Sequence, residues 1–265
     1  MNARLTTIGA AMLLAFGAPA GAPAAPIAQT CNAACLRGLA DAFLAGLESR
    51  KQGGDVPWAT RVRYTENGVG MTVGDGIWAT VTAHTPDPLV VVDPAGQSVV
   101  WIGAIEEHGQ PGWLALRIKA EAGRIVEAEA VMRRKEGRPP YADPTAFHPD
   151  PAFARTAAAG PRGRLTTLAQ AALPGGARVR NGVALTSVPA STLRAVSVAA
   201  IDPARGLVAL TGRRDHAGTA GDADGAFPHS YAFITVFKIN QGRVVAGQEV
   251  LSDTMPFLMP AWRQR

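Results

Sequence analysis

Residues 111–134 read PGWLALRIKAEAGRIVEAEAVMRR, and this stretch decides the fold. Side chains of two kinds alternate along residues 113–121 and again along 125–132, which predicts two β-strands, because successive residues of a strand face opposite sides. Residues 122–124, Ala-Gly-Arg, are predicted to be a three-residue connection, with Gly123 available for a left-handed conformation. The stretch is therefore expected to form a long antiparallel hairpin.

The expected register places opposite charges across the two strands. Arg117 faces Glu129, and Lys119 faces Glu127; each pair contributes about 0.2–1 kcal/mol. If this face of the hairpin is the outer one, the four residues form a solvated charge ladder of little energetic weight. If the face lines a cavity, Arg117 and Glu129 change each other's proton affinity and become candidates for catalysis.

The N-terminal 30 residues are predicted to be a signal peptide and a short leader. Arg4 precedes an apolar run at residues 5–18, and the small residues GAPAGAPAA follow, with cleavage expected after Ala20 or a few residues later. The run is too short to span a bilayer. The protein is therefore expected to be periplasmic or secreted, with no membrane partner after cleavage.

The composition argues against several classes of function. A hydrophobic content of 47% supports folded cores, and the net charge of +5 comes mostly from scattered arginines. No basic run is interleaved with aromatic residues, so nucleic-acid binding is not expected. The only cysteines, Cys31 and Cys35, can form a disulfide if Cys31 lies just ahead of a helix. No metal or cofactor is expected, because the CxxxC motif lacks further ligands nearby.

The order of the predicted elements indicates an α+β fold. Residues 35–51 have the spacing of an amphipathic helix, and residues 89–92 and 98–108 are predicted strands that precede the long hairpin. Residues 31–135 are therefore predicted to be a first unit of one helix and one antiparallel sheet. Residues 136–163 are rich in proline and are expected to be a linker or an arm along the surface.

Residues 164–265 contain a weaker copy of the first unit. The turn Asp202-Pro-Ala-Arg-Gly206 echoes Asp93-Pro-Ala-Gly96, and Arg180-Asn-Gly182 echoes Glu66-Asn-Gly68. Residues 230–251 repeat the long hairpin, but Val and Gln replace the charged pair of residues 117 and 129. If those two charges have a chemical role, only the first unit retains it.

Several segments resemble a family of exported proteins in the nuclear transport factor 2-like (SnoaL-like) superfamily, in tandem copies. These segments are CLRGLADAFLAGL, RYTENG, GDGIW, DPAGQ, GAIEEHG, LALRIKAEAGRIVEAE and FKINQGR. The resemblance covers nearly the whole mature chain. It implies two tandem cone-shaped units, each a helix packed on a curved, mostly antiparallel sheet with a pocket between them. The superfamily includes isomerases, dehydratases, cyclases, lyases and non-catalytic binding modules, and the short helix of the second unit indicates a degenerate copy.

The absence of GxSxG, HExxH and phosphate-loop motifs leaves acid/base chemistry in a pocket as the candidate activity. Glu66 is the leading candidate for the base, because a carboxylate beside apolar surface has a raised pKa; Arg117 and Glu129 are the other catalytic candidates. The alternative for Glu66 is a turn carboxylate that caps Asn67-Gly68. The residues expected to bind or orient a substrate are Arg63, Tyr64, Asn67, Trp78, Trp101 and Trp113. The alternative for each tryptophan is core packing.

These observations predict an exported protein with a pocket for a small, partly apolar molecule. If the protein is an enzyme, we expect a cofactor-free lyase, dehydratase or isomerase. The alternative is a non-catalytic binding or interaction module. The expected partner is a small-molecule ligand, and the sequence is compatible with a homodimer.

Overall fold

The structure is a computed structural model. The residues that it describes are 30–49, 53, 55–134, 147–157, 160–177, 179–180, 183–184, 191–217 and 228–254. Outside them lie residues 1–29 of the predicted leader, residues 136–146 of the predicted linker, and the predicted turn at Asn181-Gly182.

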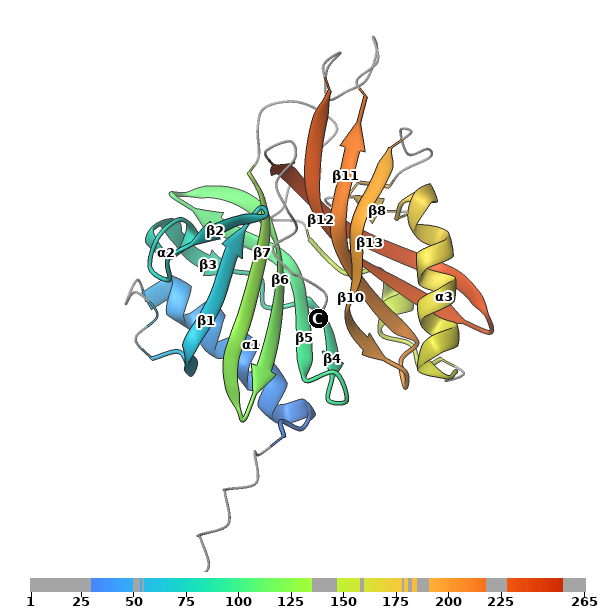
Figure 1. The fold of residues 1–265 in the computed structure, drawn as a ribbon, viewed down its shortest axis with the longest axis horizontal. Coiled ribbons are helices and arrows are strands. Elements are labelled where there is room, and N and C mark those ends of the chain that lie inside the picture. The colour runs from blue at the N-terminus through green and yellow to red at the C-terminus, as the bar shows by residue number, and fades with distance from the viewer. Residues whose placement is uncertain are drawn as a thin grey trace, which may run out of the picture.

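Two sheets pack face to face, and one helix covers the outer face of each (Figure 1). Helix α1 (Ala33–Ser49) packs on the first sheet, and helix α3 (Arg162–Ala172) packs on the second. The prediction of an α+β fold is therefore confirmed. No helix in the described ranges has both the length and the apolar character needed to cross a membrane.

The first sheet has the strand order β2-β1-β7-β6-β5-β3, and β4 also pairs with β5. Its elements in chain order are β1 (Trp58–Glu66), β2 (Val69–Met71), α2 (Ile77–Thr80), β3 (Val81–His84), β4 (Leu89–Asp93), β5 (Ser98–Glu107), β6 (Gln110–Glu121) and β7 (Arg124–Arg134). Strands β1 and β7 are parallel, and the other described pairs are antiparallel. The parallel pair brings the C-terminal ends of β1 and β7 to the same end of the sheet.

The second sheet has the order β10-β11-β12-β13-β8-β9. After the short 3-10 helix η2 (Pro151–Phe153) and α3, its elements are η3 (Leu173–Gly175), β8 (Val179–Arg180), β9 (Val183–Ala184), β10 (Thr192–Asp202), β11 (Leu207–His216), β12 (His229–Asn240) and β13 (Arg243–Thr254). Strand β8 is parallel to the last strand, β13, just as β1 is parallel to β7. In both sheets an antiparallel strand pair, β1–β2 or β8–β9, thus lies beside the second strand of a long hairpin.

The predicted register of the first hairpin is confirmed, but its turn is shorter than expected. Arg117 lies opposite Glu129, and residue 119 lies opposite residue 127. Residues 122 and 123 form a two-residue turn with φ of 48° and 73°, the conformation that matches the twist of a hairpin. A β-bulge between residues 119 and 120 restores the register that a three-residue turn would have given.

The second hairpin repeats this turn and bulge. Residues 241 and 242 have φ of 50° and 74°, and the register shifts between Lys238 and Ile239. The same two irregularities therefore occur at matching positions of β6–β7 and β12–β13.

The apolar side chains between the sheets form a core of their own. It contains residues from β4, β5, β6 and β7 on one side and from β10, β11, β12 and β13 on the other. Phe147 and Phe153, from the described part of the predicted linker, are buried in it. This part of the chain is therefore anchored between the two sheets.

Asp93 is a buried polar connection between the two halves. Its carboxylate accepts hydrogen bonds from both terminal nitrogens of Arg162, each at 2.7 Å, and from the backbone N–H of Ile201 at 2.9 Å. Inside its own turn it also accepts the N–H of Gly96 at 2.8 Å. Only 2% of the Asp93 side chain is exposed, so the turn Asp93–Gly96 is fixed against α3 and β10 by a buried charge.

The start of α1 is fixed by a disulfide and a cap. Cys31 is bonded to Cys35. It lies just ahead of the helix, which confirms the placement that was predicted to make this bond feasible. The side chain of Asn32 accepts the N–H of Cys35 at 2.9 Å and so caps the first turn. Gln97 accepts the N–H of Cys31 at 2.7 Å and donates to its carbonyl at 2.8 Å, which ties the helix to the β4–β5 turn.

We expect Asp93→Asn to lower the free energy of unfolding by about 3 kcal/mol, because it leaves Arg162 without its buried counter-charge. Asp202→Asn is the matched control at the equivalent turn, where Asp202 pairs with Arg205 and both side chains are partly exposed. That variant should lose about 1 kcal/mol or less. Urea unfolding of both variants measures the difference, and equal losses would contradict the role assigned to Asp93.

Replacing Cys31 and Cys35 together by serine should lower the free energy of unfolding by about 2 kcal/mol, the value expected for a loop of about five residues. Dithiothreitol should reproduce this loss in the wild type and have no effect on the double variant, since the chain has no other cysteine. Thermal unfolding with and without reductant makes the comparison. A wild type that is insensitive to complete reduction would show that the bond adds no stability.

Candidate functional site

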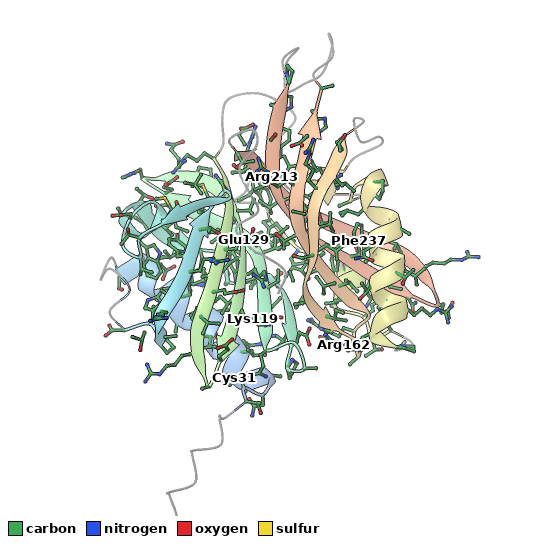
Figure 2. All side chains as sticks on the ribbon, in the orientation of Figure 1. Cys31, Lys119, Glu129, Arg162, Arg213 and Phe237 are labelled. Carbon is green, nitrogen blue, oxygen red and sulfur yellow. A yellow bond between two sulfur atoms is a disulfide. The ribbon has the colours of Figure 1, made fainter. Side chains whose placement is uncertain are left out.

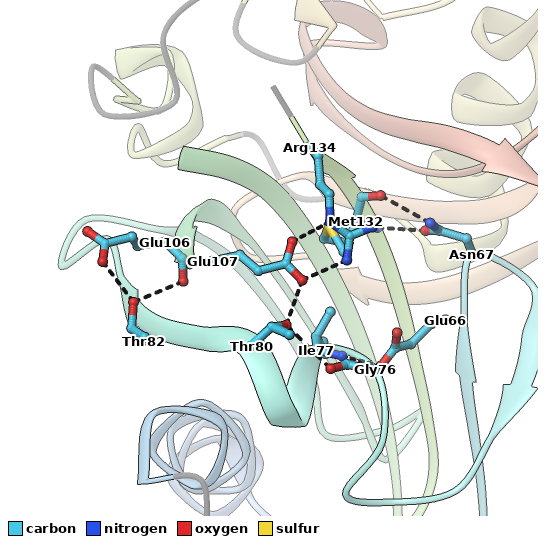
Figure 3. A network of polar contacts seen from close by, with 10 residues as sticks. All are labelled: Glu66, Asn67, Gly76, Ile77, Thr80, Thr82, Glu106, Glu107, Met132 and Arg134. Atoms are coloured by element: carbon cyan, nitrogen blue, oxygen red, sulfur yellow. Dashed lines mark hydrogen bonds and ion pairs between the residues drawn. The ribbon is translucent and has the colours of Figure 1, made fainter. Parts of the chain in front are cut away.

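Polar side chains gather at one end of the first sheet, on the face that α1 covers (Figure 3). Glu66 ends β1, Glu107 ends β5 and Arg134 ends β7. The residues two positions earlier in these strands belong to the core beneath α1: Tyr64, Ile105 and Met132. Because residues i and i+2 of a strand share a face, the three charged side chains belong to this same face.

Glu66 is partly buried and bound from two sides. The phenolic O–H of Tyr64 donates to its carboxylate, and so does the N–H of Ile77 at 2.9 Å. Gly76 lies against the carboxylate so closely that a Cβ there would be 2.2 Å from Oε2. Residue 76 must therefore be glycine if Glu66 and α2 are to stay in contact.

The two carboxyl groups of this site have pKa values shifted in opposite directions. Burial raises the pKa of Glu66, with a smaller contribution from the Glu107 charge, and together these outweigh the hydrogen bonds from Tyr64 and Ile77. Burial also acts to raise the pKa of Glu107, but hydrogen bonds from Arg134 and Thr80 and the charge of Arg134 lower it overall. One carboxyl group therefore holds its proton to higher pH than the other, which is the usual arrangement of an acid/base pair.

The side chain of Glu107 is fixed by three hydrogen bonds. Thr80 Oγ1 donates to Glu107 Oε1 at 2.5 Å, and Arg134 donates through Nε to Oε2 and through Nη2 to Oε1, the latter at 2.6 Å. Only 5% of the Glu107 side chain is exposed, compared with 58% for Arg134. Helix α2 is thus held at both ends by carboxylates, since Glu66 binds Ile77 and Glu107 binds Thr80.

Tyr64, Asn67 and Trp78 lie in or beside this site. Burial and the neighbouring Glu66 charge raise the pKa of Tyr64 well above its ordinary value, so its phenol remains a hydrogen-bond donor. The Asn67 amide accepts the N–H of Met132 at 2.8 Å and donates to its carbonyl at 3.1 Å, which joins β1 to β7. Trp78 is buried against Phe43, with ring centroids 4.8 Å apart.

The structure does not bring Arg63, Trp101 and Trp113 to Glu66. Arg63 alternates with Tyr64 and so belongs to the opposite face of β1, where it is exposed. Trp101 is buried in the core beneath α1, and its ring centroid lies 6.0 Å from that of His84. Trp113 is buried between the sheets against Phe147, at 5.1 Å.

Arg117 and Glu129 are also placed away from Glu66. Both are buried, at 8% and 5% exposure, and Glu129 lies between the sheets (Figure 2), where its carboxylate accepts the hydroxyl of Thr211 at 3.0 Å. Arg117 forms an ion pair with Glu127 at 3.2 Å. The interpretation of Arg117 and Glu129 as part of a solvated charge ladder is therefore wrong, because the second sheet covers both side chains.

Thr80, Glu107 and Arg134 were not among the predicted site residues. One signal in the sequence could have found two of them. Glu107 and Arg134 continue the alternation of their strands by one step beyond the apolar run, as Glu66 does in β1. Nothing local predicts that Thr80 would meet Glu107, because that contact depends on where α2 crosses the sheet.

The corresponding interior of the second half holds a buried ion pair. Arg214 donates from Nη2 to Glu249 at 2.8 Å and to the carbonyl of Leu173 at 3.0 Å. Thr235 donates to the same carboxylate oxygen at 2.7 Å. Arg214, Glu249 and Thr235 are completely buried, so these side chains fill the space between α3 and the second sheet at this point.

The sequence matches no protein-family model, and no curated protein matches it significantly. Within the described ranges, no group of three or more His, Cys, Asp or Glu side chains is arranged to hold a metal ion.

We expect Glu66 and Glu107 to contribute to stability with opposite dependences on pH. The raised pKa of Glu66 means that the folded state binds its proton more tightly than the unfolded state, so its contribution is lost as pH rises through the folded pKa. The lowered pKa of Glu107 gives a contribution that is present above the unfolded pKa and lost as pH falls through the folded pKa.

As the pH rises from about 3 to about 8, Glu66→Gln should therefore become more stable relative to wild type, mainly above the ordinary Glu pKa of about 4.3, and Glu107→Gln should become less stable relative to wild type, mainly below it. Urea unfolding of the three proteins across this range gives the two slopes. Slopes of the same sign would contradict the separation of the two pKa values.

Proposed function

We propose that the site of Glu66, Glu107 and Arg134 binds a small, partly apolar molecule and transfers a proton on it without a cofactor. One observation carries this proposal: two carboxyl groups at one sheet end have pKa values shifted apart by their surroundings. In this proposal Glu66 exchanges the proton, because its raised pKa brings it closer to neutral pH. Glu107 stays ionised and holds Arg134.

The contacts of Glu66 suit a group that changes its protonation state. When ionised, its carboxylate accepts hydrogen bonds from the Tyr64 hydroxyl and the Ile77 N–H, so it keeps a fixed position while it accepts a proton. The exposed Arg134 guanidinium can attract an electron-rich oxygen of the substrate. Proton removal next to such an oxygen, followed by return of the proton or loss of a leaving group, describes an isomerase, dehydratase or lyase.

We further propose that residues 31–135 and 164–265 are two copies of one cone-shaped unit of the nuclear transport factor 2-like type, the second degenerate. The shared strand order and the matching parallel pairs support this. The repeated hairpin turn and bulge support it independently.

A non-catalytic binding or interaction module is the second candidate. The observation in its favour is that side chains fill both interiors: Trp78 and Trp101 are 1% and 2% exposed beneath α1, and Arg214 with Glu249 is buried beneath α3. In that case the Glu66 network serves only to hold α2 against the sheet. Under either function we propose an exported protein, which is consistent with the Cys31–Cys35 disulfide.

A thermal-shift screen of small apolar carbonyl and hydroxyl compounds identifies the ligand, since a ligand at 100 times its Kd adds about 2.7 kcal/mol of stability. With the substrate so found, Glu66→Gln should lower kcat by about 10²- to 10⁴-fold with little change in Tm. Glu121→Gln, an exposed carboxylate at the far end of β6, is the control and should keep wild-type kcat. Normal turnover by Glu66→Gln would exclude Glu66 as the proton-transfer group, whereas a wild type that binds ligands without converting any of them would favour the non-catalytic module.

A further inference from the structure

A pocket of about 260 Å³ lies at the edge of the first sheet, separate from the Glu66 network. It lies where β3 pairs with the end of β5, beside the turn into β6. Its lining residues are Ala83, His84, Thr85, Pro86, Ala104, Ile105, Glu106, Gly109 and Pro111. A Cβ built at Gly109 meets no atom within 4 Å, so the pocket opens at this turn.

Most of the lining is apolar, and it includes one carboxylate, that of Glu106. The side chain of Glu106 is exposed and accepts a hydrogen bond from the hydroxyl of Thr82 at 2.8 Å. That hydroxyl is neutral, so it positions the carboxylate without compensating its charge. Among the described residues no ion pair involves Glu106.

Three basic side chains near the pocket already contact other acids, and the charge of His108, which precedes the lining residue Gly109, acts on the Glu107 carboxylate. His84 contacts Glu48 at 2.5 Å, and His148 contacts Asp87 at 3.6 Å. Arg134, on the other face of the sheet, is bound to Glu107. The local charge therefore favours a ligand that brings its own positive charge to Glu106.

We propose that this pocket is a second binding site and that its ligand is a small organic amine. The ammonium group pairs with Glu106, and the hydrocarbon part lies against Pro86, Pro111 and the alanines of the lining. The volume lies just below the range of about 300–1,000 Å³ that is typical of sites for drug-sized molecules. A single ring or a short alkyl chain is the size that fits.

The site is independent of the proposed proton-transfer site. Glu106 and Glu107 are neighbours in β5, but their side chains point to opposite faces of the sheet, and Figure 3 shows Glu106 with Thr82 and Glu107 with Thr80 and Arg134. The amine site can therefore exist whether or not Glu66 is catalytic. Glu66→Gln should bind the amine as the wild type does.

The test uses three probes of one size, namely benzylamine, benzyl alcohol and benzoate, titrated into the full chain and followed by protein NMR. Benzylamine should shift the amide resonances of residues 83–86 and 104–111, with benzyl alcohol weaker and benzoate weakest. Glu106→Gln should weaken benzylamine binding about fivefold, the effect expected for one exposed ion pair. Added salt should weaken it in the same direction.

Two further variants complete the test. Ala83→Leu places a larger side chain in the pocket at an exposed position, so it should abolish binding while the protein stays folded. Glu121→Gln removes the same charge far from the pocket and should leave the benzylamine Kd unchanged. Equal binding of benzylamine and benzyl alcohol, unchanged binding by Glu106→Gln, or no binding of benzylamine at millimolar concentration would each overturn the proposal.

Discussion

The structure depends above all on the burial of both faces of the two sheets. One face of each sheet packs under a helix, and the other packs against the opposite sheet. Strands β5, β11 and β12 are therefore buried over almost their whole length, and β6 and β13 over most of theirs. A strand buried on one face only would leave the alternate residues in water. The long hairpins occupy the centre because they supply apolar or compensated side chains to both faces.

Burial on both faces makes every charged residue of these strands energetically important. A charge between the sheets is costly unless it is paired and hydrogen-bonded. Asp93 accepts hydrogen bonds from Arg162 and from the backbone N–H of Ile201, and Arg133 forms an ion pair with Asp253 at 2.6 Å. These contacts join residues of the two halves, so they specify one relative placement of the sheets, which apolar packing alone leaves less defined.

The polar groups at the end of the first sheet are subject to the same constraint with a different outcome. Beyond the last core residues of β1, β5 and β7, neither the helix nor the second sheet excludes water completely. Glu66 is still buried enough for its pKa to be raised. Burial acts on Glu107 in the same way, but Arg134 compensates its charge and lowers its pKa. The second half carries Arg214 and Glu249 inside its core instead, where two complementary charges satisfy each other in a closed interior.

The sequence by itself determined the local features of this protein. Alternation along residues 111–134 predicted the hairpin and the register of Arg117 with Glu129, because the period of a strand follows from backbone geometry alone. The spacing of leucines predicted α1, and the repeated turns predicted a second hairpin. The link between Tyr64 and Glu66 was also accessible, since residues two apart share a strand face.

Only the tertiary structure decided which face of each strand meets which neighbour. Arg117 and Glu129 are buried because a second sheet, distant in sequence, covers them; the alternation is the same whether water or another sheet lies on that side. Trp101 and Trp113 are buried in different cores for the same reason. Arg134, and with it Glu107, lies near Glu66 because β1 pairs in parallel with β7. This is a non-local contact that local sequence patterns do not encode.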